Sequence, residues 1–306
     1  MRHVFIINPA AGRHDMSSVA VKRIEEACHK HRLEYDIYLT AHPMHAVDIV
    51  KKVGKAHDGN SLIFYACGGD GTLNEVAAGI SELDGDCAFT SYPIGTGNDY
   101  VKMFSGGKQA FLDLDRLLLG SPVDIDYIRS DCGCAINVLS VGLDAQVAMR
   151  KDKYRFLGGG IIPYVLSAAE SVIRGIGQEY YVNIDGRQFD GEYTMIFIGN
   201  GRFYGGGFCP VPHSDIGDGI LDVLMVKKIS RLQAAFVVSK YKNGRYRELE
   251  QFITYMPAKE IKVFSKNNED MCINLDGETV QSSHISMRIE PQRLRFVVPN
   301  GAFPIE

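Results

Sequence analysis

The stretch Gly68-Gly69-Asp70-Gly71-Thr72-Leu73-Asn74-Glu75 decides the fold, because it directly follows the apolar run 61–66. This order predicts a buried strand, a glycine turn and then a segment with apolar residues at helical spacing. Glycines at such a turn allow positive φ and let a ligand approach the backbone closely. The free N–H groups and the positive dipole end of the following helix suit a phosphate. We therefore expect a phosphate site here.

Asp70 is the unexpected member of this stretch. A carboxylate repels a neighbouring phosphate unless a divalent cation lies between the two. The motif therefore indicates a site for a metal-bound nucleotide. The plain alternative is an ordinary strand-to-helix turn with an acidic tip, which a shorter Gly-Gly-x-Gly motif alone would favour.

Polar turns also follow other apolar runs in the first 120 or so residues. Strands are expected at 4–7, 35–39, 61–66 and 88–94. Helices are expected at 17–28, 46–53, from 72 onward and at 111–119, the first of them capped by Ser17 or Ser18. Such alternation predicts a mostly parallel, doubly wound sheet with its ligands at the carboxyl ends of the strands. The turns at Asn8, Gly68 and Gly95 then share one edge.

After about Val123 the pattern changes to short β-rich runs separated by turn residues, which predicts an antiparallel sandwich-like domain. The expected strands are 124–128, 134–141, 180–184, 194–199, 220–226, 261–264, 272–275, 285–289 and 294–298. Two helical interruptions are expected, near 162–174 and 232–242. The aromatic and glycine-rich stretch 201–210 could line an acyl-chain groove or pack in the core, and core packing is preferred.

Charge and composition restrict the partners and the compartment. A net charge of −4 gives no reason to expect nucleic acid. The seven cysteines form no Cys-x-x-Cys pair, which is typical of reduced thiols in the cytoplasm. The apolar run at the N-terminus is too short for a signal peptide, and no stretch reaches the length of a membrane span. A lipid substrate would then be met from the aqueous side.

Two later motifs complete a resemblance to a known family. They are Asp218-Gly219-Ile220-Leu221-Asp222 and Leu275-Asp276-Gly277-Glu278. With the earlier turns, the chain resembles the diacylglycerol kinase catalytic-domain superfamily, and over nearly its whole length the soluble bacterial diacylglycerol kinase-like lipid kinases. The resemblance implies an α/β, NAD kinase/diacylglycerol kinase-like two-domain fold. Residues 1–123 would form a doubly wound nucleotide-binding domain to which 294–306 return, and 124–293 an antiparallel β-sandwich for lipid and metal.

The implied activity is ATP- and Mg²⁺-dependent transfer of phosphate to a lipid hydroxyl, with diacylglycerol as the favoured acceptor and phosphatidic acid as the product. Glu278 is the first choice for the general base and Asp276 its rival, while Asp70 and Asp99 belong to the catalytic set. Arg13 stands where relatives often have lysine. The implied ligands of a second, structural Mg²⁺ are Asp215, Asp218 and Ile220. The expected ATP contacts are Asn8, Pro9, Gly12, Arg13, Thr40, Gly68, Gly69, Asp70, Gly71, Thr72, Asn74, Glu75, Gly95, Thr96 and Asn98.

Basic residues are expected to bring the protein transiently to the inner face of the membrane. One set lies at 150–155 and the other at 240–247. Exposed strand edges in the second domain make a homodimer reasonable. Two other functions stay open. One is an NAD kinase, against which the Asn74-Glu75 continuation and the Leu275–Glu278 motif stand. The other is a nucleotide- or lipid-binding regulator without turnover, which would need a lost catalytic residue.

Overall fold

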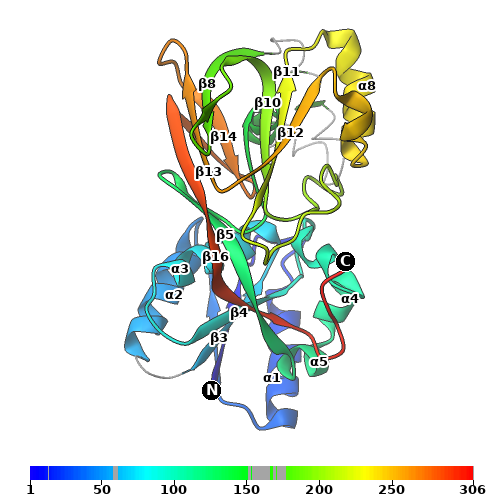
Figure 1. The fold of residues 1–306 in the computed structure, drawn as a ribbon. Helices are drawn as coiled ribbons and strands as arrows, with labels where there is room; N and C mark the ends of the chain where they lie inside the picture. The colour runs from blue at the N-terminus through cyan, green and yellow to red at the C-terminus, as the bar shows by residue number, and fades with distance from the viewer. Residues whose placement is uncertain are drawn as a thin grey trace. The chain divides into compact units, whose positions relative to one another are not determined.

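The computed structural model describes residues 1–12, 14–57, 61–150, 153, 166–167, 170 and 177–305. The chain forms two compact units (Figure 1). The first comprises Met1–Ile125 and Gln292–Glu306, and the second Asp126–Pro291. The helix expected near 162–174 lies almost entirely outside the described residues.

The first unit is built on a parallel sheet with the strand order β2–β1–β3–β4–β16. Its strands are β1 (Arg2–Ile7), β2 (Tyr35–Leu39), β3 (Leu62–Cys67), β4 (Cys87–Tyr92) and the end of β16 (His284–Val298). All six residues of β3 are buried, as expected of a strand covered on both faces. In the register, Val4 lies opposite Asp36 of β2 and Phe64 of β3.

Helices cover both faces of this sheet. They are α1 (Ser17–His31), α2 (His45–Ala56), α3 (Asp70–Ser81), α4 (Gly107–Leu112) and α5 (Leu114–Leu118), with a 3₁₀ turn η1 (Tyr100–Met103). The chain moves outward from β1 to β2 and then back past β1 to β3, so right-handed crossovers place α1 on one face and α2 and α3 on the other (Figure 1). This reversal at β1 and β3 confirms the doubly wound fold and marks where ligands bind.

Two local expectations for this unit are wrong. Helix α1 begins at Ser17 after the N-cap residue Met16, and no serine side chain caps it; the carboxylate of Asp15 accepts the Ser17 N–H instead. The single helix expected at 111–119 is two short helices, because Asp113 starts a new one by accepting the N–H of Arg116.

The second unit is an antiparallel β-structure. Along the sheet β15 pairs with β14, β14 with β7, β7 with β10, β10 with β8, β8 with β13 and β13 with β16, while β11 pairs with β10 and β12. The strands are β5 (Ser121–Ser130), β6 (Gly133–Ala135), β7 (Val138–Gly142), β8 (Gln178–Ile184), β9 (Arg187–Gln188), β10 (Gly191–Gly199), β11 (Leu221–Lys227), β12 (Ile253–Ala258), β13 (Glu260–Ser265), β14 (Met271–Leu275) and β15 (Glu278–Ser282).

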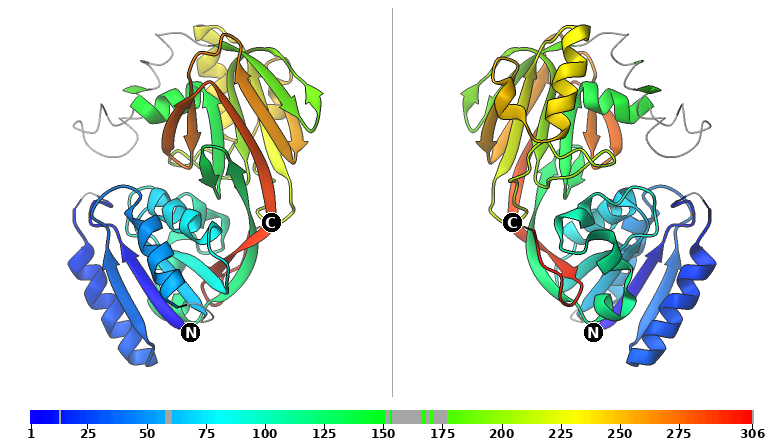
Figure 2. Two further views of the ribbon diagram at one scale, coloured as in Figure 1. Left: turned by 90° about the vertical axis from the view of Figure 1, so that its left-hand side faces the viewer. Right: turned by 90° about the vertical axis from the view of Figure 1, so that its right-hand side faces the viewer.

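Two apolar clusters stabilise the second unit. The larger fills the space between its strands and contains Leu139, Ile196 and Ile273. The smaller lies under helix α8 (Arg231–Lys242) and the 3₁₀ turn η3 (Tyr246–Leu249), where Phe197, Leu224 and Val237 are buried. Helix α8 lies against the strands in the right-hand view of Figure 2. Helix α6 (Leu143–Arg150) follows β7 and was not expected from the sequence.

The strand expected at 134–141 is interrupted between β6 and β7. The N–H groups of Ile136, Asn137 and Val138 donate to the carboxylate of Asp276. A backbone whose donors turn to a side chain cannot continue a regular ladder at those residues. Conversely, the two strands expected at 285–289 and 294–298 are one long strand, β16, which changes its pairing from β13 to β4 along its length.

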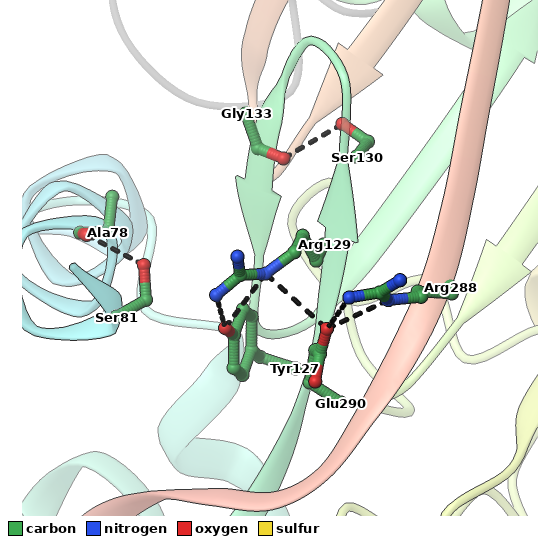
Figure 3. Close-up of polar contacts among 8 residues, drawn as sticks. All are labelled: Ala78, Ser81, Tyr127, Arg129, Ser130, Gly133, Arg288 and Glu290. Atoms are coloured by element: carbon green, nitrogen blue, oxygen red, sulfur yellow. Dashed lines mark hydrogen bonds and ion pairs between the residues drawn. The ribbon is translucent and has the colours of Figure 1, made fainter.

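Polar side chains tie β5 to β16 within the second unit (Figure 3). The guanidinium of Arg129 donates to the hydroxyl of Tyr127 at 2.7 Å and lies 3.4 Å from the carboxylate of Glu290. Arg288 donates to the same carboxylate at 2.8 Å. The hydroxyl of Ser130 closes the turn into β6 by donating to the Gly133 carbonyl. These contacts fix the strand pair through which the chain leaves and re-enters the first unit.

Candidate active site

The expected phosphate-binding turns of the first unit lie at the carboxyl edge of its parallel sheet. Asn8 follows β1, Thr40 follows β2 and Gly68 follows β3. Asn8 Nδ2 donates to Thr72 Oγ1 over 3.1 Å and thereby joins the β1 loop to the start of α3. Pro9 and Gly12 continue that loop. Gly12 has a φ of +92°, which other residues rarely adopt.

The glycines of the two main turns serve close packing rather than positive φ. A Cβ on Gly68 would lie 2.2 Å from Thr72 Oγ1, and one on Gly69 would lie 2.8 Å from the carbonyl oxygen of Gly97. A Cβ on Gly95 would lie 2.6 Å from the Gly69 nitrogen. Glycine allows positive φ, but Gly68, Gly69 and Gly95 do not adopt it. The glycines are required because the two turns lie against each other with no room for side chains.

The start of α3 has the donors that a phosphate needs. The N–H of Asp70 donates to the Gly97 carbonyl, but in the part of the chain that the structure describes the N–H groups of Gly71 and Thr72 have no acceptor. Asn98 of the Gly95–Asn98 turn supplies no such donor, because its Nδ2 already donates to the Gly95 carbonyl and its buried Oδ1, an acceptor, has no partner among the described residues. Unsatisfied donors at a helix N-terminus are a ready anion site.

The carboxylate of Asp70 fixes the backbone that follows the second turn, Gly95–Asn98. It accepts the N–H of Asp99 at 2.9 Å and that of Tyr100 at 3.2 Å. Burial raises its pKa to about 6, and the neighbouring Asp99 carboxylate also raises it, whereas the two N–H bonds act in the opposite direction. The side chain of Asp99 forms an ion pair with Lys102. The hydrogen bond between the two acids therefore joins the Asp70 carboxylate to the backbone N–H of Asp99.

The remaining residues expected to contact ATP have different surroundings. Glu75 accepts the N–H of Ala46 at the start of α2, so its carboxylate joins two helices. Asn74 is buried beside it on α3, and Thr96 is exposed at the tip of its turn. Arg13 lies outside the described residues.

Lys108 is a cation near the second turn that sequence reasoning missed. It belongs to α4, and its Nζ donates to the Gly95 carbonyl at 3.0 Å. Nothing in the sequence around it distinguishes it from a solvated lysine, because the contact depends on how α4 packs after η1. Its position places a positive charge on the turn whose backbone lies against Gly68 and Gly69.

The Asp276-Gly277 turn joins β14 to β15 in the second unit. Both residues have positive φ, +50° and +98°, as in a type I′ hairpin turn. The Asp276 carboxylate is buried and accepts three N–H groups, from Ile136 at 2.7 Å, Asn137 at 3.1 Å and Val138 at 2.6 Å. These bonds favour its charged form and hold the loop between β6 and β7.

Glu278 is the first residue of β15 and is exposed. Among the described residues its carboxylate has no hydrogen bond or ion pair, in contrast to that of Asp276. A carboxylate that is not engaged can accept a proton from an approaching hydroxyl without breaking the fold.

The acidic loop 215–222 gathers carboxylates around Asp218. Burial raises the pKa of Asp218, and the charges of Asp215, Asp222 and Asp126 raise it further. Asp126 is fully buried on β5 and accepts the Gly219 N–H at 2.7 Å, a role that its sequence context does not reveal. Within the described ranges no three His, Cys, Asp or Glu side chains converge as metal ligands.

The glycine-rich stretch 201–210 packs as a tight turn over the smaller core cluster. Tyr204 and Phe208 form a bridge around three glycines with positive φ. The Tyr204 hydroxyl is buried, donates to Asp144 at 3.2 Å and lies 3.0 Å from the Tyr241 hydroxyl. The preference for core packing over an acyl groove is therefore supported for these aromatic rings.

A doubly wound parallel sheet followed by an antiparallel sandwich is the NAD kinase/diacylglycerol kinase-like fold. Residues 2–130 match the family "Diacylglycerol kinase catalytic domain", and residues 137–298 match the family "YegS C-terminal NAD kinase beta sandwich-like domain". The chain belongs to this YegS-like family of lipid kinases, and it is a phosphotransferase.

Individual relatives agree with this family. The chain is 32% identical over 251 residues to a "Probable lipid kinase YegS-like" of Xanthomonas oryzae pv. oryzae (strain MAFF 311018), covering 77% of this chain and 78% of the relative. A crystal structure of a diacylglycerol kinase from Bacillus anthracis str. Sterne is similar with a TM-score of 0.69 at 17% identity, covering 97% of this chain and 96% of that one. A second structure from that organism gives 0.75 at 21% identity, with 97% and 95% covered. The structural likenesses support the fold alone.

A helix that crosses a bilayer needs about 20 apolar residues in a row. In the described ranges, no helix is long and apolar enough to cross one. The seven cysteines are free thiols, as expected.

Proposed function

We propose that this chain transfers the γ-phosphate of ATP to the hydroxyl of diacylglycerol and forms phosphatidic acid. The observation that carries the proposal is the phosphate cradle at α3. The N–H groups of Gly71 and Thr72 have no acceptor among the described residues, so both are left to donate to a phosphate. The relatives named as lipid kinases support the choice of a lipid as the acceptor.

The first unit would bind the nucleotide. The α3 N-terminus and the Gly95–Asn98 turn would hold the phosphates, and the loops at Asn8 and Thr40 would surround the rest of ATP. Asp70 would act mainly by fixing the second turn, since both its oxygens accept backbone N–H groups. Arg13 is part of the same proposal from its place in the sequence alone.

Mg²⁺ fits the acidic character of both units. When bound, it neutralises the charge that develops on the phosphates during transfer. Near the phosphates the proposed carboxylates are Asp70 and Asp99. A second Mg²⁺ would be held by the Asp218 carboxylate with backbone oxygens at Asp215 and Ile220. The raised pKa of Asp218 supports this, because a cation relieves the repulsion of the surrounding carboxylates.

The second unit would contribute the general base and bind the lipid. We propose Glu278 as the base, because its carboxylate is exposed and not engaged, whereas that of Asp276 holds three backbone N–H groups. Glu278 would accept the proton of the lipid hydroxyl as this oxygen bonds to the γ-phosphorus. The bond from that phosphorus to the β–γ bridging oxygen breaks, and ADP leaves. In this account the residues 1–123 and 294–306 serve the nucleotide, and 124–293 serve lipid and metal.

The proposed location follows from the proposed acceptor. Diacylglycerol resides in membranes, so the enzyme would work in the cytoplasm with transient contact to the inner face of the membrane. A homodimer remains part of the proposal, because β12 and β15 pair on one side only in the described part of the second unit.

Radiolabelled ATP with a panel of lipids in mixed micelles tests this function. We expect label in phosphatidic acid, and we expect Glu278→Gln to lower kcat by about 100-fold or more while the fold is kept. Glu269→Gln is the matched control, since Glu269 is also exposed in the second unit. Transfer to NAD and to no lipid would overturn the proposal, and full activity of Glu278→Gln would remove Glu278 from catalysis.

A further inference from the structure

Helix α8 exposes apolar side chains that the fold does not bury. Leu232 is 91% exposed, Phe236 50% and Val238 43%. The helix itself is firmly started, because Ser230 and Gln233 form a reciprocal capping box at its N-terminus. Its other face, with Ala234 and Val237, packs on the smaller core cluster. The outward apolar residues are therefore held in place on a rigid element.

The exposed residues form a stripe along the helix. Leu232, Ala235, Phe236 and Ser239 follow the spacing i, i+3, i+4, i+7 and are exposed. Leu232 and Phe236 lie one turn apart. Large apolar side chains on neighbouring turns are expensive in water, and a contiguous patch of this kind marks a contact surface.

Positive charge surrounds this stripe. Between Lys227 and Glu250 there are seven lysines and arginines against two glutamates, in a chain whose net charge is −4. Ion pairs with Glu192 and Glu248 take up part of this charge and leave a positive excess. The Lys240 ammonium lies 4.7 Å from the centre of the exposed Phe236 ring. A cation beside an exposed aromatic ring on the apolar face of a helix is typical of a helix that lies in a membrane interface.

We propose that α8 and η3 form the surface by which this enzyme docks on an anionic bilayer, with Leu232 and Phe236 entering the headgroup boundary. The proposal rests on the lipid acceptor of the proposed function and names the surface that meets the membrane. The basic side chains around the stripe attract the anionic headgroups, each strengthening binding by about fivefold. The docked helix lies parallel to the membrane plane and does not span it.

Charge decides between a bilayer and a second copy of the chain. A symmetric dimer through α8 would bring two equal positive surfaces together, and like charges across an interface oppose association. An anionic bilayer complements the same charges and also accepts the apolar stripe. The bilayer is therefore the occupant that the surface fits.

Sedimentation of the full chain with vesicles tests the docking without any turnover. Phosphatidylcholine vesicles with and without phosphatidylserine are the probes, in the absence of ATP. We expect binding only with phosphatidylserine, weakened by salt. Leu232→Gln with Phe236→Gln should weaken it about tenfold, and Lys242→Gln with Arg247→Gln should weaken it about 25-fold. Both pairs are on the helix surface or η3, so the fold should be kept.

Matched controls come from the far strands of the second unit. Phe264 is 43% exposed on β13, and Lys259 and Arg187 are exposed basic residues. Phe264→Gln and the pair Lys259→Gln, Arg187→Gln should leave vesicle binding unchanged. Equal binding of the α8 variants and the native chain would overturn the docking surface, even if lipid kinase activity is found. The docking surface would also be overturned if the native chain is a dimer without vesicles, the α8 variants are monomers, and these variants still bind vesicles. If the α8 variants lose vesicle binding and the native chain phosphorylates no lipid, the docking surface is supported and the proposed function is rejected.

Discussion

In the Asp70 turn of the first unit and in the Asp276 turn of the second, a carboxylate accepts backbone N–H groups. The two carboxylates differ in how many N–H groups they accept and in the backbone conformation of the acid itself. Asp70 accepts two backbone N–H groups, from Asp99 and Tyr100, and burial raises its pKa to about 6. Asp276 accepts three, from residues 136–138, and its own backbone has a left-handed φ of +50°. Each acid fixes a segment that is remote in sequence, and Asp276 is the more heavily engaged.

This difference shows that an acid in a glycine turn need not be a catalytic group. Both residues attract attention in the sequence because a carboxylate beside glycine suggests chemistry. In the structure their oxygens accept backbone N–H groups. Glu278, directly after the Asp276-Gly277 turn, is exposed, and its carboxylate has no hydrogen bond or ion pair with the part of the chain that the structure describes. A structural acid and a candidate base therefore differ in whether their carboxylate oxygens already accept hydrogen bonds from the backbone.

The largest expected effect is on stability, from Asp276→Asn. The variant replaces one acceptor oxygen by an NH₂ group that faces backbone donors, so the free energy of unfolding should fall by about 4 kcal/mol. Urea unfolding followed by fluorescence would measure it. Asparagine also tolerates left-handed φ, so backbone strain adds little.

Asp185→Asn is the matched control for this variant. Asp185 also has positive φ and accepts the N–H groups of Lys259 and Glu260, but it is exposed. Its loss should cost less than about 1 kcal/mol, because water replaces the lost bonds. Similar costs for both variants would show that burial of Asp276 is not what makes its hydrogen bonds important.

Parts of this structure follow from local patterns, and parts do not. The parallel sheet could be predicted because buried strands such as β3 are continuous apolar runs between turns. Strands β12 and β15 were missed, since one contains Pro257 and the other is largely polar. The role of Asp276 could not be predicted, because its partners lie almost 140 residues away. Asp126 was missed for the same reason, since its partner Gly219 is 93 residues away. Lys108 was missed because its contact with Gly95 depends on how α4 packs after η1.

His3 is a buried group of the first unit whose pKa shifts in the direction opposite to that of Asp70. Burial lowers the pKa of His3 to about 4, and its Nδ1 lies 2.8 Å from the Tyr65 hydroxyl. As the pH falls, His3 is therefore protonated in the unfolded chain before it is protonated in the folded chain. The free energy of unfolding then falls as the pH falls from about 6.5 to about 4. Asp70 acts in the opposite direction. Its raised pKa keeps a proton in the folded state that the unfolded chain has lost, so stability rises as the pH falls from about 6 to about 4.

Each contribution reaches about 3 kcal/mol at the end of its range. In Mg²⁺-free buffer, His3→Gln should become more stable relative to the native protein as the pH falls through this window, and Asp70→Asn less stable. Unfolding free energies measured between pH 4 and pH 7 would show two opposite slopes. Parallel slopes for His3→Gln and Asp70→Asn would refute the opposition.

The smallest expected effect on stability comes from Lys108, which contacts the Gly95 turn beside the Asp70 turn. Its ammonium donates to the Gly95 carbonyl and so positions the turn that lies against Gly68 and Gly69. In Lys108→Met we expect stability to fall by about 1 kcal/mol and the KM for ATP to rise about fivefold, with kcat within about twofold. The reason is that a displaced turn weakens binding of the phosphates equally before and during transfer. Lys108→Arg keeps a donor and should restore most of the affinity, and Lys55→Met on α2 should change neither constant. A fall in kcat of tenfold or more with an unchanged KM would instead place Lys108 at the transferring phosphate.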